Sequence, residues 1–298
     1  MAVLNYVTQF DTRIRDMYGH ELVSDALYHT NEDIKVTGAK EIKIPRMQVS
    51  GYKDHDRKTL GFNSGNYSND FETKSLDHDR DIEFAIDPMD VDETNQIVSI
   101  ANIQARFEKK QAIPELDCYT FSKLYSEAKR VGAVIRNTVI TRANILEDFD
   151  ENCEAFENAG VPLSRCILYC TAAYRRELKN ADGIQRTLEV SGGSKSLDRR
   201  VHTLDDLKEI KTVPVERFKT AYDFTEGYKA DASGKQINYI LIDPEAQVSR
   251  VKYAYINTYT PGHDSRVADN YLYQNRRYNG TFGLDEELKQ ACIINAEA

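Results

Sequence analysis

The chain has 298 residues, of which 41% are hydrophobic, enough to bury the core of two modest domains or of one elongated domain. Its 39 Lys and Arg against 48 Asp and Glu give a net charge of −9 with no block of five or six like charges, so the basic stripe of a dedicated duplex-DNA binder is not visible. No apolar run approaches the ~20 residues of a membrane span, and the N-terminus lacks a signal-peptide pattern, which predicts a protein made in a cytoplasm.

The first 36 residues read as a mostly polar N-terminal arm with an amphipathic piece around residues 22–28. Strand patterns follow, because Ile42 and Ile44 alternate with polar residues, as Ile82, Phe84 and Ile86 do later. The intervening "GFNSGNYSND" is typical of a turn. The simplest structure is one long antiparallel hairpin from Ile42 to Asp87.

This predicted hairpin contains the same tetrapeptide twice, Asp54-His55-Asp56-Arg57 and Asp77-His78-Asp79-Arg80. Two His-Asp clusters suggest a metal site, but alternate residues of a strand point to opposite faces, which separates the histidine from the aspartates. Folding about Tyr67 instead places complementary charges opposite each other, with Asp54 facing Arg80, His55 facing Asp79, Asp56 facing His78 and Arg57 facing Asp77. This register needs a bulge near Ser50-Gly51. The predicted charge ladder therefore comprises Asp54, Asp56, Arg57, Asp77, Asp79 and Arg80.

Helical periodicity dominates the middle of the chain and strand patterns return near its end. Three helices are predicted, over 90–107, over 114–128 with Pro114 in the first turn, and over 141–158. A strand at 165–170, a short helix at 171–178, a polar stretch at 180–200, a helical turn at 202–210 and a strand near 211–218 follow. The last strands are expected at 237–243, 251–259 and 269–278. No βαβ alternation is present, so the fold class is α+β.

Other signals of chemistry are weak. "VSGGSKS" at 190–196 lacks the glycine spacing of a phosphate loop, no nucleophile elbow is present, and the six histidines show no helical metal spacing. The five cysteines are scattered and are expected to be reduced thiols. We predict no catalytic residue, cofactor or metal ligand, and hence no enzyme.

The order of these elements, together with several local strings, resembles tailed-bacteriophage major capsid proteins of the Hong Kong 97 type. The strings are "GFNSGNYSNDFETKSLDHDRDIEFAIDPMDVDETN" (61–95), "IPELDCYTFSKL" (113–124), "VPVERFKT" (213–220) and "ADNYLYQNRRYNGTF" (268–282). The resemblance covers the chain from about Thr37 to Phe282 and rests on the order of the strings more than on any one of them.

The resemblance implies a Hong Kong 97-type fold in four parts. Residues 1–36 would be the N-terminal arm and 37–89 the extended loop that reaches over the adjacent subunit. Residues 90–138 and 245–283 would form the peripheral domain with its long spine helix, and 139–244 and 284–298 the axial domain. Some members cross-link through Lys and Asn side chains, but no motif identifies the donor, acceptor and helper acid in this chain.

The function that the resemblance implies is that of a subunit which self-assembles through pentamers and hexamers into the icosahedral head of a tailed phage. The shell would enclose double-stranded DNA without sequence-specific binding, in a virion assembled in the host bacterial cytoplasm and without a membrane. Scaffolding, portal and decoration proteins are the expected partners. Two alternatives stay open: an encapsulin-like compartment shell, and a metal-binding hydrolase that uses the two Asp-His-Asp clusters.

Overall fold

The computed structural model describes residues 22–28, 41–55, 62–89, 100–181, 207–262 and 269–297. Several predicted segments lie outside these ranges: most of the N-terminal arm, the first part of the helix predicted at 90–107, and most of the polar stretch at 180–200. Asp56 and Arg57 of the predicted ladder also lie outside them. The helical turn expected at 202–210 lies outside them up to residue 206, and residues 209 and 210 are strand.

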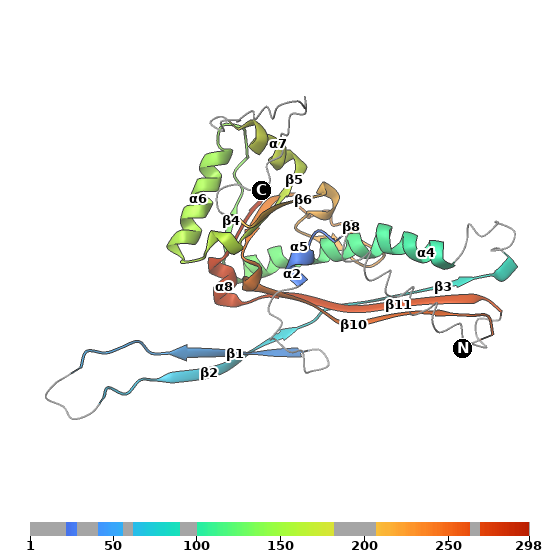
Figure 1. Cartoon of the computed structure of the whole chain (residues 1–298), viewed down its shortest axis with the longest axis horizontal. Coiled ribbons are helices and arrows are strands. Elements are labelled where there is room, and N and C mark those ends of the chain that lie inside the picture. Colours follow the sequence, from blue (N-terminus) through green and yellow to red (C-terminus); the bar gives the residue numbers. More distant parts are fainter. Residues whose placement is uncertain are drawn as a thin grey trace, which may run out of the picture.

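A long three-stranded antiparallel sheet and a long helical segment form one part of the molecule (Figure 1). The strand order is β10 (Gln247–Tyr259), β11 (Tyr271–Gly283) and β3 (His78–Ile86). The helical segment comprises α4 (Ile100–Phe107), a π-helical turn (Glu108–Ala112) and α5 (Ile113–Val131). Pro114 lies in the first turn of α5, and Gly132 ends the helix in the left-handed conformation at φ 73°. The helix predicted at 114–128 is confirmed.

A five-stranded mixed sheet with helices on both faces forms the second part. Its order is β4 (Val134–Arg136), β12 (Cys292–Ala296), β9 (Ile237–Ile242), β5 (Ile167–Thr171) and β6 (Glu209–Val213). One face packs against α5 through Phe121 and Ile240, and the other buries Phe149 and Phe156 of α6 (Ile145–Asn158). All residues of β5 are buried because both faces of the sheet are covered.

Shorter elements complete the described chain. They are α2 (Asp25–Tyr28), α7 (Ala172–Asn180), α8 (Asp285–Gln290), β7 (Tyr222–Asp223), β8 (Lys229–Ala230) and the 3-10 turns Leu163–Arg165, Val215–Arg217 and Pro244–Ala246. The α+β class is confirmed, and so are the helix predicted at 141–158, the short helix after the strand at 165–170, and the three late strands.

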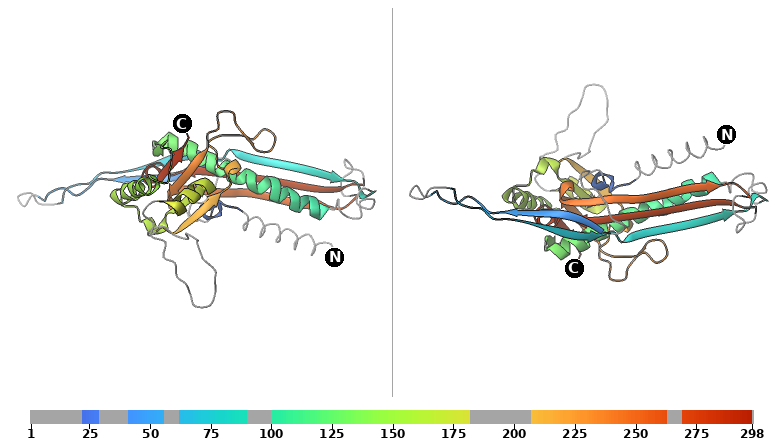
Figure 2. Two further views of the ribbon diagram at one scale, coloured as in Figure 1. Left: turned by 90° about the horizontal axis from the view of Figure 1, so that it is seen from above. Right: turned by 90° about the horizontal axis from the view of Figure 1, so that it is seen from below.

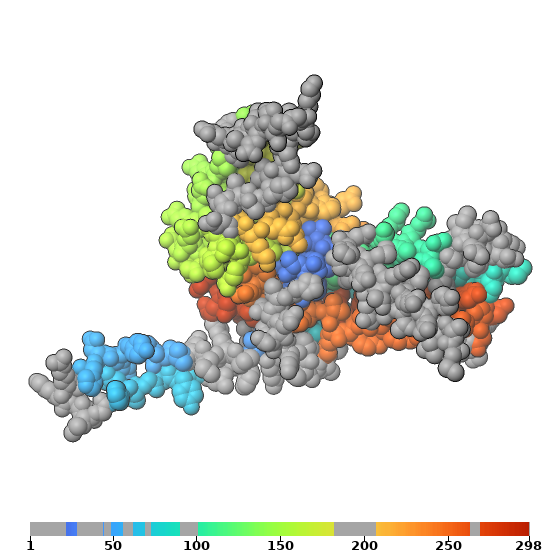
Figure 3. All heavy atoms as spheres, viewed as in Figure 1, coloured from blue at the N-terminus to red at the C-terminus, as the bar shows by residue number. Residues whose placement is uncertain are grey.

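A two-stranded hairpin projects from the body of the molecule (Figures 1 and 3). It pairs β1 (Glu41–Val49) with β2 (Tyr67–Ser75), from Glu41 opposite Ser75 to Val49 opposite Tyr67. Beyond the paired strands, the Ser50 amide donates to the Asn66 carbonyl at 2.9 Å and the Asn63 side chain donates to the Asp54 carbonyl at 2.7 Å.

The predicted hairpin from Ile42 to Asp87 is therefore wrong in its second half. Residues 78–86 form β3, which pairs with β11, so that Asp79 lies opposite Tyr278 and Arg80 opposite Arg277. Asp54 consequently does not face Arg80, nor His55 Asp79. Because all nine residues of β3 pair with β11, the chain crosses from the hairpin into the long sheet after Ser75.

The N-terminal segment 22–28 is anchored on α5 by a buried carboxylate. Oδ1 of Asp117, which is fully buried, accepts from the Ser24 amide at 3.0 Å and from the Ser24 hydroxyl at 2.8 Å. Arg217 Nη1 lies 3.2 Å from Oδ2. Burial raises the pKa of Asp117, and these hydrogen bonds and Arg217 oppose the rise. Leu27 is buried in the adjoining core, so segment 22–28 belongs to the folded body.

The Asp117→Ala variant should lose about 3 kcal/mol of unfolding free energy, because Arg217 and the Ser24 donors lose a buried partner. Urea denaturation measures this loss. Asp231→Ala is the control, since Asp231 is exposed and bonds Ser233 two residues away. Equal midpoints for the two variants would contradict the anchoring role of Asp117.

Candidate functional site: the distal hairpin and its base

The distal hairpin exposes large apolar side chains to an unusual degree. Phe62 is 98% exposed and Val49 72%, and Tyr52 and Tyr67 are exposed on the same hairpin. Val49, Tyr52 and Phe62 line a hollow of about 710 Å³ between the two arms of the loop. An isolated two-stranded hairpin is marginally stable in water, so contact with another protein would stabilise it. The exposed apolar side chains form a surface suited to such a contact.

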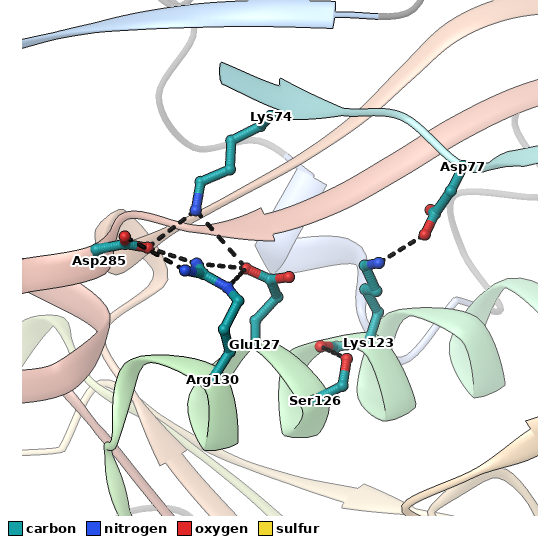
Figure 4. A network of polar contacts seen from close by, with 7 residues as sticks. All are labelled: Lys74, Asp77, Lys123, Ser126, Glu127, Arg130 and Asp285. Carbon is teal, nitrogen blue, oxygen red and sulfur yellow. Dashed lines mark hydrogen bonds and ion pairs between the residues drawn. The ribbon is translucent and has the colours of Figure 1, made fainter. Parts of the chain in front are cut away.

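A cluster of four charges fixes the base of this hairpin to the body (Figure 4). Lys74 at the end of β2 is 8% exposed, and its Nζ lies 2.9 Å from Asp285 Oδ1 and 3.9 Å from Glu127 Oε2. Arg130 joins the same two carboxylates, with Nη2 2.8 Å from Glu127 Oε2. Its hydrogen bond to Asp285 is the main reason why the pKa of Arg130 lies above its ordinary value. Each cation thus contacts both anions, which connects β2 to α5 and α8.

Asp77, in the connection between β2 and β3, binds α5 about one turn closer to the N-terminus of the helix (Figure 4). Lys123 Nζ contacts Oδ2 at 2.5 Å, and the Tyr119 hydroxyl donates to Oδ1. Burial alone would raise the pKa of Asp77, but the hydrogen bonds from Lys123 and Tyr119 outweigh it and the pKa lies below its ordinary value. The carboxylate is therefore held ionised between the two donors.

The first residues of β3 pack onto the same helix. The His78 ring stacks on Tyr119 with centroids 4.1 Å apart, and its Nε2 lies 3.5 Å from Glu115 Oε1. Arg80 Nε lies 2.7 Å from the same Glu115 oxygen, and the guanidinium also donates to the Phe224 carbonyl. Asp77, His78 and Arg80 are thus bound to α5 and its neighbours instead of to the opposite arm of a hairpin.

Leu76 wedges the chain at the crossing from β2 to β3. Its side chain is 4% exposed and packs with Val248 and Phe282, while the Tyr278 hydroxyl donates to the Leu76 carbonyl at 2.8 Å. A Cβ atom on Gly280 would lie 1.9 Å from Leu76 Cδ2, so a larger residue here would require the Leu76 side chain to move. The apolar wedge and the two charged contacts together fix where the hairpin leaves the body.

The residues of the predicted charge ladder are thus dispersed. Asp54 is exposed on the distal hairpin, Asp79 pairs with Arg276 at 2.7 Å on β11, and Asp77 and Arg80 bind α5. Within the described ranges, no group of three or more His, Cys, Asp or Glu side chains is placed to hold a metal ion. Likewise, no helix of the described residues is long and apolar enough to cross a membrane.

Sequence reasoning did not identify the charge cluster at the base. Lys74 and Asp285 are 211 residues apart, and nothing local distinguishes them from other charged residues. Glu127 and Arg130 carry the one available signal, an i,i+3 pair on a predicted helix, which indicates an ion pair but not its partners on other elements.

No family model and no curated protein matches the chain. Solved structures do match it. Among solved structures, the chain is similar to the mature capsid of bacteriophage PhiM1, with 13% identity, a TM-score of 0.64, and 87% of this chain and 82% of that chain covered. The capsid of cyanophage P-SCSP1u matches with 9% identity, a TM-score of 0.60, and 91% and 86% coverage. A structure from Mycobacterium phage Che8 matches with 10% identity, a TM-score of 0.57, and 92% and 90% coverage.

These likenesses extend over nearly the whole chain, so the fold is that of phage capsid subunits. The Hong Kong 97-type architecture expected from the order of the sequence strings agrees with this result. At identities of 9–13% the likeness establishes the fold and leaves the function to be argued separately.

Replacing Lys74 by Met keeps the length of the apolar stem but leaves Asp285 and Glu127 with one cation fewer. We expect a loss of about 2 kcal/mol and a coupling of about 1 kcal/mol with Asp285→Asn in a double-mutant cycle. Lys53→Met is the control, because Lys53 lies on the exposed part of the same hairpin. Additive effects of Lys74→Met and Asp285→Asn would show that the pair is not coupled.

A second expectation concerns Gly280, where Gly280→Ala should destabilise the chain by about 1–3 kcal/mol because the new methyl group overlaps Leu76. Thermal or urea unfolding measures the loss. Adding Leu76→Ala removes the overlapping atoms. The double variant should therefore lose less unfolding free energy than the sum of the losses in the two single variants. Strict additivity would mean that Leu76 is not the obstacle.

Proposed function

We propose that the chain is the structural subunit of an icosahedral tailed-phage head that encloses double-stranded DNA. The observation that carries this proposal is the likeness to phage capsid structures over about nine tenths of the chain. A shell built from many copies closes through repeated heterologous contacts, so each interface can be modest. The similar structures from bacteriophage PhiM1 and cyanophage P-SCSP1u are capsids, which supports the association of this chain with copies of itself.

The proposed division of the chain follows the capsid architecture. Residues 1–36 are assigned to the N-terminal arm and 37–89 to the extended loop, with β3 at its end joining the long sheet. Residues 90–138 and 245–283 form the peripheral domain, and 139–244 with 284–298 the axial domain. The continuous helical segment from α4 to α5 then serves as the spine helix.

The projecting hairpin supplies the physical argument for assembly. Its apolar side chains are exposed in the single chain and can be buried on a neighbouring subunit, while Lys74 and Asp77 hold its base in one direction. We call this hairpin, residues 41–75, the clamp. In a closed shell every copy would make the same contact, so small gains in binding free energy per contact would add up. The proposed partners of the chain are scaffolding, portal and decoration proteins, and the proposed place of assembly is the host bacterial cytoplasm.

Electron microscopy of the full-length chain, expressed alone and with the scaffolding protein of the same phage, tests the proposal directly. Closed icosahedral particles are expected under at least one condition. Monomers under both conditions would exclude a shell subunit. Particles that package a specific enzyme and no DNA would favour the compartment-shell alternative.

The double variant Tyr52→Ser/Phe62→Ser should leave the monomer fold and its unfolding midpoint unchanged, since both side chains are exposed. Particle formation should fall about thirtyfold or more, as expected for the loss of an interface anchor worth ~2 kcal/mol per contact. Sedimentation velocity measures the particle fraction. Val215→Ser, which alters an exposed apolar residue away from the hairpin, is the control. Normal particle yield from the double variant would exclude the clamp.

A further inference from the structure

A cleft of about 630 Å³ lies beside β3, the strand at one margin of the three-stranded sheet. Consecutive residues of β3, from His78 to Ile82, line this cleft, and Phe84 lines it further along. Alternate residues of a strand point to opposite faces of the sheet, so a cleft that touches consecutive residues meets the strand along its edge. The cleft therefore opens onto the side of β3 that faces away from β11.

In the described part of the chain, no strand other than β11 pairs with β3. Both views in Figure 2 show β3 (teal) as the outermost strand on one side of the sheet, with β10 on the other side. An edge strand leaves alternate backbone N–H and C=O groups without a partner in the ladder. Those groups can pair with an added strand.

One side of the helical segment forms the opposite wall of the cleft. The residues of this wall recur at the intervals expected for one side of a helix: Phe107, Gln111, Ala112, Glu115 and Leu116. The ring of Phe107 meets that of Phe84 edge to face, with the centroids 5.6 Å apart. These rings give the cleft an apolar lining together with Ile82 and Leu116.

A buried glutamate holds the helical segment in this rotation. Glu108 is 1% exposed, and its Oε1 accepts from Asn275 Nδ2 and from Arg277 Nη2, both at 2.8 Å. Both donors lie on β11, so Glu108 turns its side of the π-helical turn toward the sheet. The neighbouring side, which carries Phe107 and Gln111, consequently faces the edge of β3.

Arg80 and a loop close one end of the cleft. Arg80 Nε lies 2.7 Å from Glu115 Oε1, and the guanidinium donates to the carbonyl groups of Phe224 and Gly227. The loop between β7 and β8 therefore lines the cleft at this end. Beyond Arg80, six further residues of β3 extend the edge by about 20 Å at ~3.4 Å per residue.

The face of β3 that points away from the helix is acidic. Asp79, Asp81 and Glu83 are exposed on this face, and Ala85 completes the alternation. The cations near them lie on other strands. Arg276 on β11 pairs with Asp79, and Lys252 on β10 lies over the Tyr278 ring at 5.7 Å. A strand added beside β3 would thus have carboxylates as its direct neighbours on this face.

The charges inside the cleft are matched by partners of the same chain. Arg80 pairs with Glu115, and Arg277 pairs with Glu108. At the rim, the exposed Glu226 lies 3.9 Å from Lys229. The side of an added strand that faces the helix consequently meets a mainly apolar surface with no excess of either charge.

We propose that the edge of β3 binds an extended segment of a separate partner protein, which adds a fourth strand to the sheet. Backbone pairing supplies affinity in this mode of recognition, and side chains supply specificity. Apolar side chains of the segment enter the cleft between Phe84 and Phe107, while basic side chains on its other face lie beside Asp81 and Glu83. The segment therefore alternates apolar and basic residues. The edge is present in the single chain, so this proposal goes beyond the proposed capsid function.

The test measures binding of a fluorescently labelled peptide, Thr-Lys-Val-Lys-Val-Lys-Thr, to the full-length chain, kept dispersed as checked by sedimentation. Fluorescence anisotropy should show saturable binding. One control peptide carries Glu in place of each Lys. A second control keeps every side chain but has N-methylated backbone amides, which cannot donate to β3. Both control peptides should bind about tenfold more weakly or worse.

Two variants of the chain test the cleft and the carboxylates separately. Ala112→Phe fills the cleft, and Asp81→Lys/Glu83→Lys reverses the charges beside the added strand. Each variant should weaken binding of the lysine peptide by about tenfold or more. Urea unfolding midpoints check that both variants are folded.

Matched controls make the same changes at exposed positions elsewhere. Ala143→Phe adds an equal ring, and Glu154→Lys/Asp231→Lys gives an equal change of net charge. Both controls should bind the lysine peptide as the parent chain does.

Weaker binding in the two edge variants, with normal binding in their controls, supports the proposal. Equal binding of the methylated peptide would overturn it, as would equal losses in variants and controls or a parent chain that does not bind the lysine peptide. Binding by dispersed chains that disappears in assembled particles would also overturn it, in favour of a second copy at this edge. The capsid function is tested apart from this, by electron microscopy of the parent chain without peptide.

Discussion

The helix α5 is held on two sides at once, and the positions of the other parts follow from it. Phe121, Leu124 and Ala128 bury one side against the five-stranded sheet, while the Tyr119 hydroxyl reaches Asp77 and the Thr281 amide on the other side. Further contacts from Asp117 and from Lys123, Glu127 and Arg130 reach segment 22–28 and the base of the hairpin. A helix fixed in this way cannot rotate without breaking contacts to both large sheets, to segment 22–28 and to the base of the hairpin.

The base of the hairpin combines two kinds of contact with different consequences. Leu76 contributes apolar burial, which depends little on direction, whereas the Lys74 and Asp77 ion pairs define an orientation but add modest net stability after desolvation. A projection held by charges alone would be weakly held, and one held by a single apolar wedge could pivot. Together they give the hairpin a defined direction as it leaves the body.

Local patterns predicted the elements well because they depend on periodicity and on end signals such as Pro114. The pairing between strands was harder to predict from the sequence. The repeated Asp-His-Asp-Arg is complementary to itself when folded antiparallel, but this property gives no information about a competing strand 190 residues later in the chain. β11 provides that strand, and the registers of β1–β2 and β3–β11 show that backbone pairing and the Leu76 wedge prevailed over side-chain charge matching. The base cluster was unpredictable for the same reason, since its four charges come from three elements far apart in sequence.

Net charge is a sum over the whole chain, and the fold decides which of these charges are exposed. The value of −9 argues against a dedicated duplex-DNA binder, but it does not show which surface carries which charges. Glu108 shows how the fold separates the two signs: a carboxylate adjacent in sequence to Lys109 and Lys110 is buried against Arg277, which removes it from the helical face. The same residue that fixes the rotation of the helix thereby removes one negative charge from the exposed face of this turn.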